Sequence, residues 1–276
     1  MACAVFTGAM SAGAQSAGSA KLRILFPAYG NPHNEDGRAM WKKLAELSRD
    51  RPEELEIEVI FNPASGPGEA RDPNYLRDDD TGPLADAQGL RILGYVTTSY
   101  AKRSAEEVKA EIDQYATGCY AGFVSGIFFD ETSSDLDTAD YYRGLSQYAH
   151  DVIKPRDGQP VITISNPGIG AVQSPISDQR LRAYATAMDR TVVFEHEAAQ
   201  YPDQQPAAIQ PFLSADRLAH IVHSQATWSA ALVGAMQRRG VANVFITDDV
   251  MQNPYDRLPT YFDRLCEAVI AANRSQ

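Results

Sequence analysis

Two adjacent carboxylates close a hydrophobic run near the middle of the sequence, in the segment Gly126-Ile127-Phe128-Phe129-Asp130-Glu131. Several other strand-like runs also end in polar or acidic residues. Apolar strands with their chemistry at the carboxyl ends are typical of catalytic α/β barrels, whose active sites are built from those ends. Cleavage of a glycosidic bond needs one carboxylic acid and a second carboxylate that acts as nucleophile or base. The pair Asp130 and Glu131 therefore indicates glycosidase chemistry at a barrel mouth.

Adjacent strand residues point to opposite faces, so Asp130 and Glu131 cannot both point into the barrel from one strand. We expect one to end the strand and the other to lie in the loop, turned back over the mouth. Crowding and burial would raise the pKa of one of them, so that an acid survives near neutral pH. Glu195 ends a run two strands further along and is the predicted partner across the cleft. The alternative is that the two acids cap the next helix or pair with arginine.

The other predicted strand ends supply polar and aromatic side chains that we expect to bind substrate. Tyrosine rings at strand ends can stack on a sugar face, and Glu197 projects to the same face as Glu195. His223 binds sugar hydroxyls in this interpretation, or is a core histidine. Asp248 orients a hydroxyl or amine, or simply begins a loop. The predicted substrate-binding residues are Tyr29, Asn62, Tyr95, Thr98, Tyr100, Asn166, Glu197, His223 and Asp248.

Eight short runs rich in Val, Ile and Phe predict strands that are buried on both faces. They are Ile24–Tyr29, Glu56–Asn62, Arg91–Thr98, Gly126–Asp130, Val161–Asn166, Thr191–Glu195, His220–Ser224 and Asn243–Thr247. Helical patterns lie between them at Arg38–Arg49, Asn74–Gln88, Thr138–Ile153, Asp178–Met188, Trp228–Arg239 and Arg257–Ala272. A further helix begins at Ser104, where Ser-Ala-Glu-Glu is a capping box. The helix expected within Gln205–Leu218 is the weakest, because that segment contains Pro206 and Pro211.

Strand–helix alternation predicts a parallel sheet with right-handed crossovers, and eight repeats close it into a (β/α)8, or TIM, barrel. An open doubly wound sheet is the alternative. Its dinucleotide-binding form is disfavoured, because no Gly-x-Gly-x-x-Gly follows the first strand. We expect one catalytic domain over residues 21–276. Residues 1–20 are small and low in complexity, and are interpreted as a disordered leader or the remnant of a secretory signal.

Composition limits the partners. The chain has 276 residues and a net charge of −11, which disfavours nucleic acid or an anionic membrane surface. No run approaches the roughly 18 apolar residues of a transmembrane helix. The three cysteines fit no zinc or haem spacing, and Cys119 and Cys266 are interpreted as buried thiols, with one bridge between them as the alternative. We expect no metal, no cofactor and a monomer.

Three motifs together resemble the spherulation-specific family 4, or spherulin-4 family. They are Phe61-Asn62-Pro63-x-Ser65-Gly66-Pro67-Gly68, then Gly94-Tyr95-Val96-x-Thr98-x-Tyr100 with Arg103, then Gly126 to Glu131. The resemblance covers roughly residues 24–270. It implies a (β/α)8 fold and kinship with secreted glycoside hydrolases that cut galactosaminogalactan-type polymers within the chain, at α-1,4 N-acetylgalactosamine linkages. It also implies that Asp130, Glu131 and Glu195 are catalytic. The first strand departs from the family pattern, since Phe26-Pro27-Ala28-Tyr29 stands where a Tyr-Pro pair is expected.

The prediction is thus an endo-acting glycoside hydrolase of an amino-sugar polysaccharide, secreted or at the cell surface, or else cytoplasmic if the leader is no signal. The first alternative is a carbohydrate-binding or spore-coat protein on the same barrel. A metal-dependent hydrolase using His223, Asp248 and Glu195 is disfavoured, because the first strand lacks a His-x-His pair. A serine esterase is disfavoured, because there is no Gly-x-Ser-x-Gly elbow.

Overall fold

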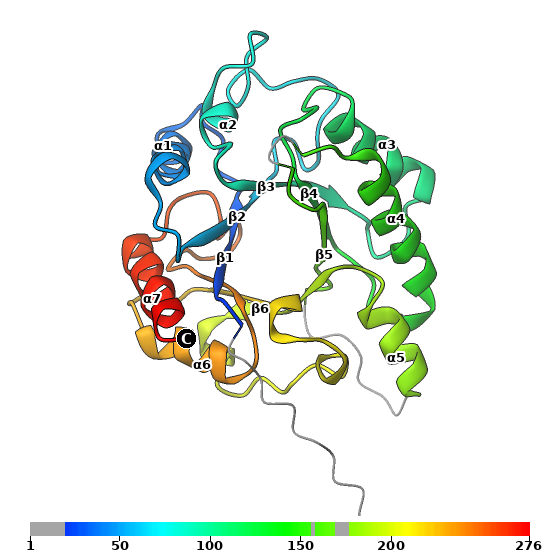
Figure 1. Cartoon of the computed structure of the whole chain (residues 1–276), viewed down its shortest axis with the longest axis vertical. Helices are drawn as coiled ribbons and strands as arrows, with labels where there is room; N and C mark the ends of the chain where they lie inside the picture. Colours follow the sequence, from blue (N-terminus) through cyan, green and yellow to red (C-terminus); the bar gives the residue numbers. More distant parts are fainter. Residues whose placement is uncertain (1–19, 156–157, 169–176) are drawn as a thin grey trace, which may run out of the picture.

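The computed structural model describes residues 20–155, 158–168 and 177–276, and their strands form one closed parallel barrel in sequence order (Figure 1). The predicted barrel is therefore confirmed, and the open sheet is wrong. The strands are β1 (Arg23–Ala28), β2 (Glu56–Phe61), β3 (Arg91–Thr97), β4 (Gly126–Asp130), β5 (Ile162–Ser165), β6 (Arg190–Glu197), β7 (Leu218–His223) and β8 (Asn243–Ile246). The leader expected over residues 1–20 lies, apart from Ala20, outside the described residues.

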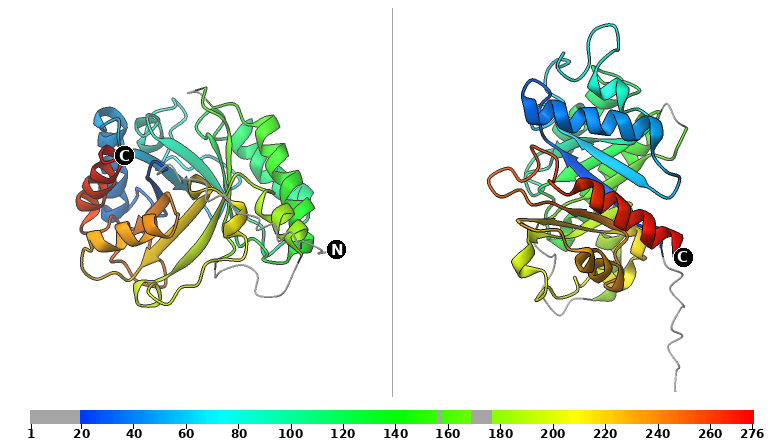
Figure 2. Two further views of the ribbon diagram at one scale, coloured as in Figure 1. Left: turned by 60° about the horizontal axis from the view of Figure 1, so that its bottom comes forward. Right: turned by 90° about the vertical axis from the view of Figure 1, so that its left-hand side faces the viewer.

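Helices surround the barrel on its outside (Figures 1 and 2). They are α1 (Glu35–Asp50), α2 (Pro83–Asp86), α3 (Ala105–Ala116), α4 (Ala139–Val152), α5 (Asp178–Ala185), α6 (Ala230–Arg238) and α7 (Phe262–Arg274). The ring closes where α1 and α7, from opposite ends of the chain, lie side by side (Figure 2). Lys43 of α1 and Asp263 of α7 form an ion pair of 2.6 Å across this contact.

Two helical predictions are wrong in extent. The helix expected over Asn74–Gln88 is confined to Pro83–Asp86, because the segment before it is a series of turns that ends at Gly82, where φ is +135°. The helix expected within Gln205–Leu218 is absent from that segment, which forms the 3-10 turns Gln210–Phe212 and Ala215–Arg217. Proline lacks the N–H that an α-helix needs in its interior, which accounts for this second difference.

The core lies inside the barrel and between the barrel and its helices. Trp41 of α1 packs edge-on against Phe61 of β2 at 6.0 Å, and its indole N–H donates to the carbonyl of Gly30 at 3.0 Å. Both sides of the capping box of α3 are formed, because Ser104 accepts from the backbone of Glu107 and the Glu107 side chain accepts from the backbone of Ser104. These contacts hold the outer layer in register with the strands.

Glycine allows the closest approach between two neighbouring strands. A Cβ atom at Gly126, the first residue of β4, would lie 2.0 Å from the carbonyl oxygen of Ile162 in β5. The two residues are partners in the β4–β5 register. Only a glycine fits here without moving β4, the strand that carries the acidic pair. Cys119 and Cys266 are free thiols, as predicted, but only Cys266 is buried and Cys119 is partly exposed. None of the helices in the described ranges has the length and apolar character to cross a bilayer.

Candidate active site

Asp130 and Glu195 face each other at the carboxyl end of the barrel, joined by one amide group. Asn166, which follows β5, donates from Nδ2 to Asp130 Oδ1 at 2.8 Å and to Glu195 Oε2 at 2.6 Å. Because both oxygens contact the same nitrogen, they are no more than about 5.4 Å apart. The three residues come from the ends of β4, β5 and β6, so the closed sheet brings them together.

Two tyrosines complete the hydrogen bonding of the carboxyl pair. Tyr95 of β3 donates from its hydroxyl to Asp130 Oδ2 at 2.7 Å, and Tyr255 donates to Glu195 Oε1 at 2.6 Å. Each of the four carboxyl oxygens therefore accepts one hydrogen bond. Tyr29 packs edge-on against both tyrosines, at 5.8 Å from Tyr95 and 5.5 Å from Tyr255. Burial raises the pKa of all three hydroxyls, so they remain protonated donors.

Asp130 has a raised pKa. Burial, and then the nearby charge of Glu195, raise its pKa to about 6, against the lowering effects of the Tyr95 and Asn166 hydrogen bonds. A carboxyl group with such a pKa still carries a proton in mildly acidic solution. Asp130 can therefore serve as the acid of the pair, one of the two roles that paired carboxylates need.

Glu131 lies in the loop directly after β4, which ends at Asp130, as expected for the second acid of the pair. Its φ of +48° is in the left-handed region, which is unusual for a residue other than glycine. The Glu131 carboxylate accepts from Thr97 Oγ1 at 2.7 Å, and its carbonyl accepts from the backbone of Tyr100 at 2.6 Å. The loop after β3 thus fixes the direction of this second acid. The alternative, in which the acids cap a helix or pair with arginine, is not what these contacts show.

A pocket of about 380 Å³ opens beside Glu195. Tyr29, Glu195, Glu197 and His223 line it, as do His196 and the loop residues Met251, Gln252, Asn253, Pro254 and Tyr255. The rings of His196 and His223 lie nearly parallel, with centroids 6.1 Å apart. Burial and the neighbouring His196 lower the pKa of His223, so its ring is neutral near pH 7.

Four of the predicted substrate-binding residues lie apart from this group. Asn62 accepts from the backbone of Gly66 and shapes its own loop. Thr98 is fully buried, with its hydroxyl bonded to the carbonyl of Glu131. Tyr100 is half exposed at the rim. Asp248 accepts from the backbone and hydroxyl of Thr260 at 3.0 and 2.8 Å, so it anchors the segment before α7.

Two contacts of the carboxyl groups were missing from the sequence-based prediction. Thr97, and not Thr98, holds the Glu131 side chain, because the pleat turns these neighbours to opposite faces. Tyr255 lies in the loop between β8 and α7, well beyond the end of its strand. An aromatic residue after Asn-Pro in a loop at the barrel mouth was the available signal. His196, which was not among the predicted substrate-binding residues, also lines the pocket.

Metal ligation finds no support in the grouping of side chains. Among residues 20–155, 158–168 and 177–276, no cluster of three or more His, Cys, Asp or Glu side chains has an arrangement that would hold a metal ion. His223, Asp248 and Glu195 have separate partners, since His223 contacts Ser224 and Asp248 contacts Thr260. The residues of the metal-dependent alternative are therefore each engaged elsewhere.

Comparisons with known proteins agree on one family. Residues 23–269 match the profile of the spherulation-specific family 4. The chain is 29% identical over 266 residues to spherulin-4 of Physarum polycephalum, an alignment that covers 92% of this chain and 72% of that protein. It is also similar to the crystal structure of Aspergillus clavatus Sph3 in complex with GalNAc, with a TM-score of 0.71 and 27% identity. That match covers 91% of this chain and 98% of Sph3.

Proposed function

The chain belongs to the spherulation-specific family 4, and we propose that it is an endo-acting glycoside hydrolase of an amino-sugar polysaccharide. The observation that carries the proposal is the pair Asp130 and Glu195, held by one amide group at the barrel mouth. The raised pKa of Asp130 supports it further, because a binding protein has no need for a carboxyl group that keeps its proton in mildly acidic solution.

In the proposed reaction Asp130 is the general acid and Glu195 the nucleophile. Asp130 gives its proton to the glycosidic oxygen as the bond to the anomeric carbon breaks, and Glu195 forms the bond to that carbon. Asp130 then takes a proton from water, which displaces Glu195. The nearest oxygens of the two groups are at most about 5.4 Å apart, which is closer than the roughly 6.5–9.5 Å of inverting enzymes. We therefore propose retention of configuration. A substrate N-acetyl group is the alternative nucleophile.

The proposed substrate is galactosaminogalactan-like, cut at α-1,4 N-acetylgalactosamine linkages. Support comes from the likeness to Sph3, whose structure holds GalNAc, and from the pocket beside Glu195. Tyr29 and the parallel rings of His196 and His223 offer flat surfaces for sugar rings. Glu197 is exposed at the same pocket, where its carboxylate would attract the ammonium group of a deacetylated unit. Secretion and a monomeric state remain part of the proposal.

Product release from acetylated and deacetylated galactosaminogalactan tests this function. Wild type should release oligosaccharides, and Asp130→Asn and Glu195→Gln should each lower kcat by at least about 100-fold while remaining folded by circular dichroism. Glu131→Gln measures the contribution of the third acid. Asp140→Asn, on the exposed face of α4, is the matched control and should leave the rate unchanged.

Two further results separate the alternatives. Trapping of a sugar on Glu195, followed by mass spectrometry of the peptide, would support the covalent mechanism, whereas its absence with retained configuration would favour the N-acetyl group as nucleophile. A folded wild type that binds these polymers and cleaves neither would instead favour the carbohydrate-binding or spore-coat protein.

A further inference from the structure

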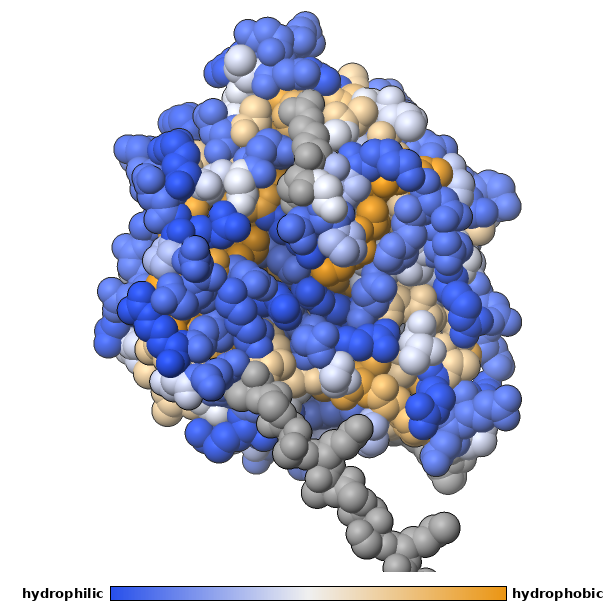
Figure 3. All heavy atoms as spheres, viewed as in Figure 1, coloured by the Kyte–Doolittle hydropathy of each residue, from blue (hydrophilic) through white to orange (hydrophobic). Residues whose placement is uncertain are grey.

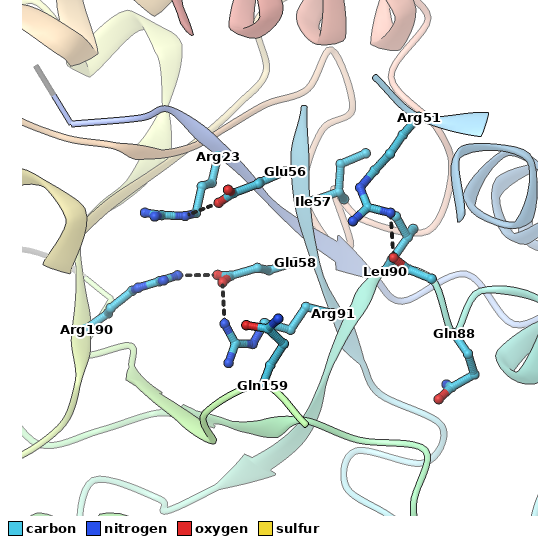
Figure 4. A pocket seen from close by; sticks show the side chains of 11 residues that line it. Arg23, Arg51, Glu56, Ile57, Glu58, Gln88, Leu90, Arg91, Gln159 and Arg190 are labelled. Atoms are coloured by element: carbon cyan, nitrogen blue, oxygen red, sulfur yellow. Dashed lines mark hydrogen bonds and ion pairs between the residues drawn. The ribbon is translucent and has the colours of Figure 1, made fainter. Parts of the chain in front are cut away.

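A second cavity, of about 450 Å³, lies at the opposite end of the barrel from the carboxyl pair. Its walls come from the beginnings of β1, β2, β3 and β6 and from the loops that precede β3 and β5. Figure 4 shows its charged side chains, which are Arg23, Arg51, Glu56, Glu58, Arg91 and Arg190. Figure 3 looks onto this end of the molecule, and hydrophilic residues line the hollow near its centre.

Positive charge exceeds negative charge in this lining. Glu58, only 3% exposed, pairs with Arg190 and lies 3.9 Å from Arg91. Glu56 pairs with Arg23 and, at 2.9 Å, with Lys21. Each of the two carboxylates therefore contacts two cations. The net charge of the whole chain is −11, so this positive group is an exception on the molecule.

Arg51 adds a further guanidinium, which donates to a neutral carbonyl group. Its Nη1 donates to the carbonyl of Gly89 at 2.6 Å, at the edge of the cavity. The lining thus contains four arginines and two carboxylates. A guanidinium presents its N–H donors in a planar fork that matches the oxygens of phosphate.

Buried donors in the cavity wall lack a complete set of acceptors. Arg23 Nη1 is buried and has no hydrogen-bond partner in the described part of the chain. The Arg190 side chain is 9% exposed and makes its side-chain hydrogen bonds to Glu58 and Asn243 from Nη1 alone, as far as the described residues show. A buried charged donor without a partner costs free energy, which an anionic ligand would recover. Both guanidinium groups line the cavity (Figure 4).

We propose that this cavity binds a dianionic oxyanion of the phosphate class, either free phosphate or the phosphate group of a small phosphorylated sugar. Arg23 and Arg190 contact the oxyanion inside the cavity, and Arg51 contacts it at the edge. The volume admits a molecule larger than phosphate alone. The site is separate from the carboxyl pair and does not depend on the proposed hydrolase activity.

Thermal unfolding of the full chain measures the binding. Inorganic phosphate at about ten times its Kd should raise the Tm by roughly 2–5 °C relative to sodium chloride at equal ionic strength. Isothermal titration calorimetry with the same probe gives the stoichiometry, which should be one. The thermal unfolding measurement is repeated with hexose 6-phosphate and with the neutral hexose. A larger shift with hexose 6-phosphate than with inorganic phosphate would identify the phosphorylated sugar as the ligand, and equal shifts would identify free phosphate.

Two variants test whether Arg23 and Arg51 form the proposed phosphate site. Arg23→Gln removes the buried donor, and Arg51→Gln removes the edge contact while leaving both carboxylate pairs intact, so it remains informative if Arg23→Gln is unstable. Each should lower phosphate affinity at least about tenfold. Lys42→Gln, an exposed change on α1 that removes one positive charge, should leave the affinity unchanged. No phosphate-specific shift in wild type, or an equal affinity in Arg51→Gln, would overturn the proposal.

Discussion

Asp130 combines burial with a nearby carboxylate, and this combination has a cost in stability. Its pKa is raised to about 6 in the folded chain, whereas an unfolded aspartate has a value of 3.8. The folded state therefore binds the proton more tightly, and its stability falls as pH rises from about 3.8 through about 6. Above that window the loss approaches about 3 kcal/mol.

Asp130→Asn should remove this loss, since the amide cannot ionise. We expect the variant to gain stability relative to wild type between pH 4 and pH 7.5, by an amount on the order of 1–3 kcal/mol. Urea unfolding at both pH values measures the difference. Asp140→Asn, an exposed change, is the control and should show the same small difference at both. A constant difference for Asp130→Asn would mean that the carboxyl group is ionised throughout this range.

The same pKa predicts the alkaline limb of the rate profile. If Asp130 is the general acid, it must be protonated in the free enzyme, so kcat/KM should fall about tenfold per pH unit above pH 6. Initial rates on a polymeric substrate between pH 4 and 8 measure this limb. A plateau that persists to pH 8 would exclude Asp130 as the acid.

Thr97 and Thr98 show how far residue-level inference reached. The sequence-based prediction ended the third strand at Thr98, one residue beyond its observed end at Thr97, and chose the neighbour whose side chain points to the other face. Thr97→Val should lower kcat by about 10-fold with little loss of stability, because it removes the hydroxyl that holds Glu131. Thr98→Val should instead lower stability by about 1–3 kcal/mol, since it removes a buried hydroxyl that donates to the Glu131 carbonyl and lies 3.3 Å from the Tyr142 hydroxyl. Activity and urea unfolding of both variants separate the two roles, and equal effects on activity would contradict them.

Among the strands, β4 was predicted with the same bounds that the structure shows. A strand buried on both faces is a short continuous apolar run, and in Gly126–Asp130 that run ends sharply at a charge. The segment before α2 contains the buried residues Tyr75 and Leu76, whose burial is set by packing against other elements and has no helical period. Tyr255 was missed for a related reason, because the path of the loop after β8 depends on tertiary contacts.

Glycine-to-alanine substitution should have opposite effects at Gly126, in the contact between β4 and β5, and at Gly144, on the surface of α4. Gly126→Ala should destabilise the protein by about 3 kcal/mol, because the added Cβ would lie 2.0 Å from the carbonyl oxygen of Ile162. Gly144→Ala, on the exposed face of α4 with no atom within 4 Å of the added Cβ, should stabilise it by about 0.5–1 kcal/mol. Denaturant unfolding of both variants tests the pair. Equal effects would mean that β4 shifts freely, and the position of Asp130 would then not depend on Gly126.

In the molecule as a whole, two groups of polar side chains lie at opposite ends of the barrel. The carboxyl pair and the tyrosines gather where the strands finish, and the arginine-rich cavity lies where they begin. The sequence predicted the first end, because polar residues followed the apolar strands there. It did not predict the second, because Arg23, Arg91 and Arg190 are far apart in the chain and each was a single charged residue at the start of a strand.

The net charge of −11 predicts long-range attraction of a cationic polymer to the whole molecule. Such attraction acts over the Debye length, which shrinks from about 10 Å at 0.1 M salt to about 3 Å at 1 M. The kcat/KM for a deacetylated substrate should therefore fall as salt is raised, whereas that for the neutral, fully acetylated substrate should change little. Initial rates on both substrates over a salt series measure the contrast. If Glu197 alone attracted the ammonium groups, Glu197→Gln would remove the salt dependence; if the field of the whole chain is responsible, the variant keeps most of it. A deacetylated substrate whose kcat/KM ignores salt would exclude both forms of attraction.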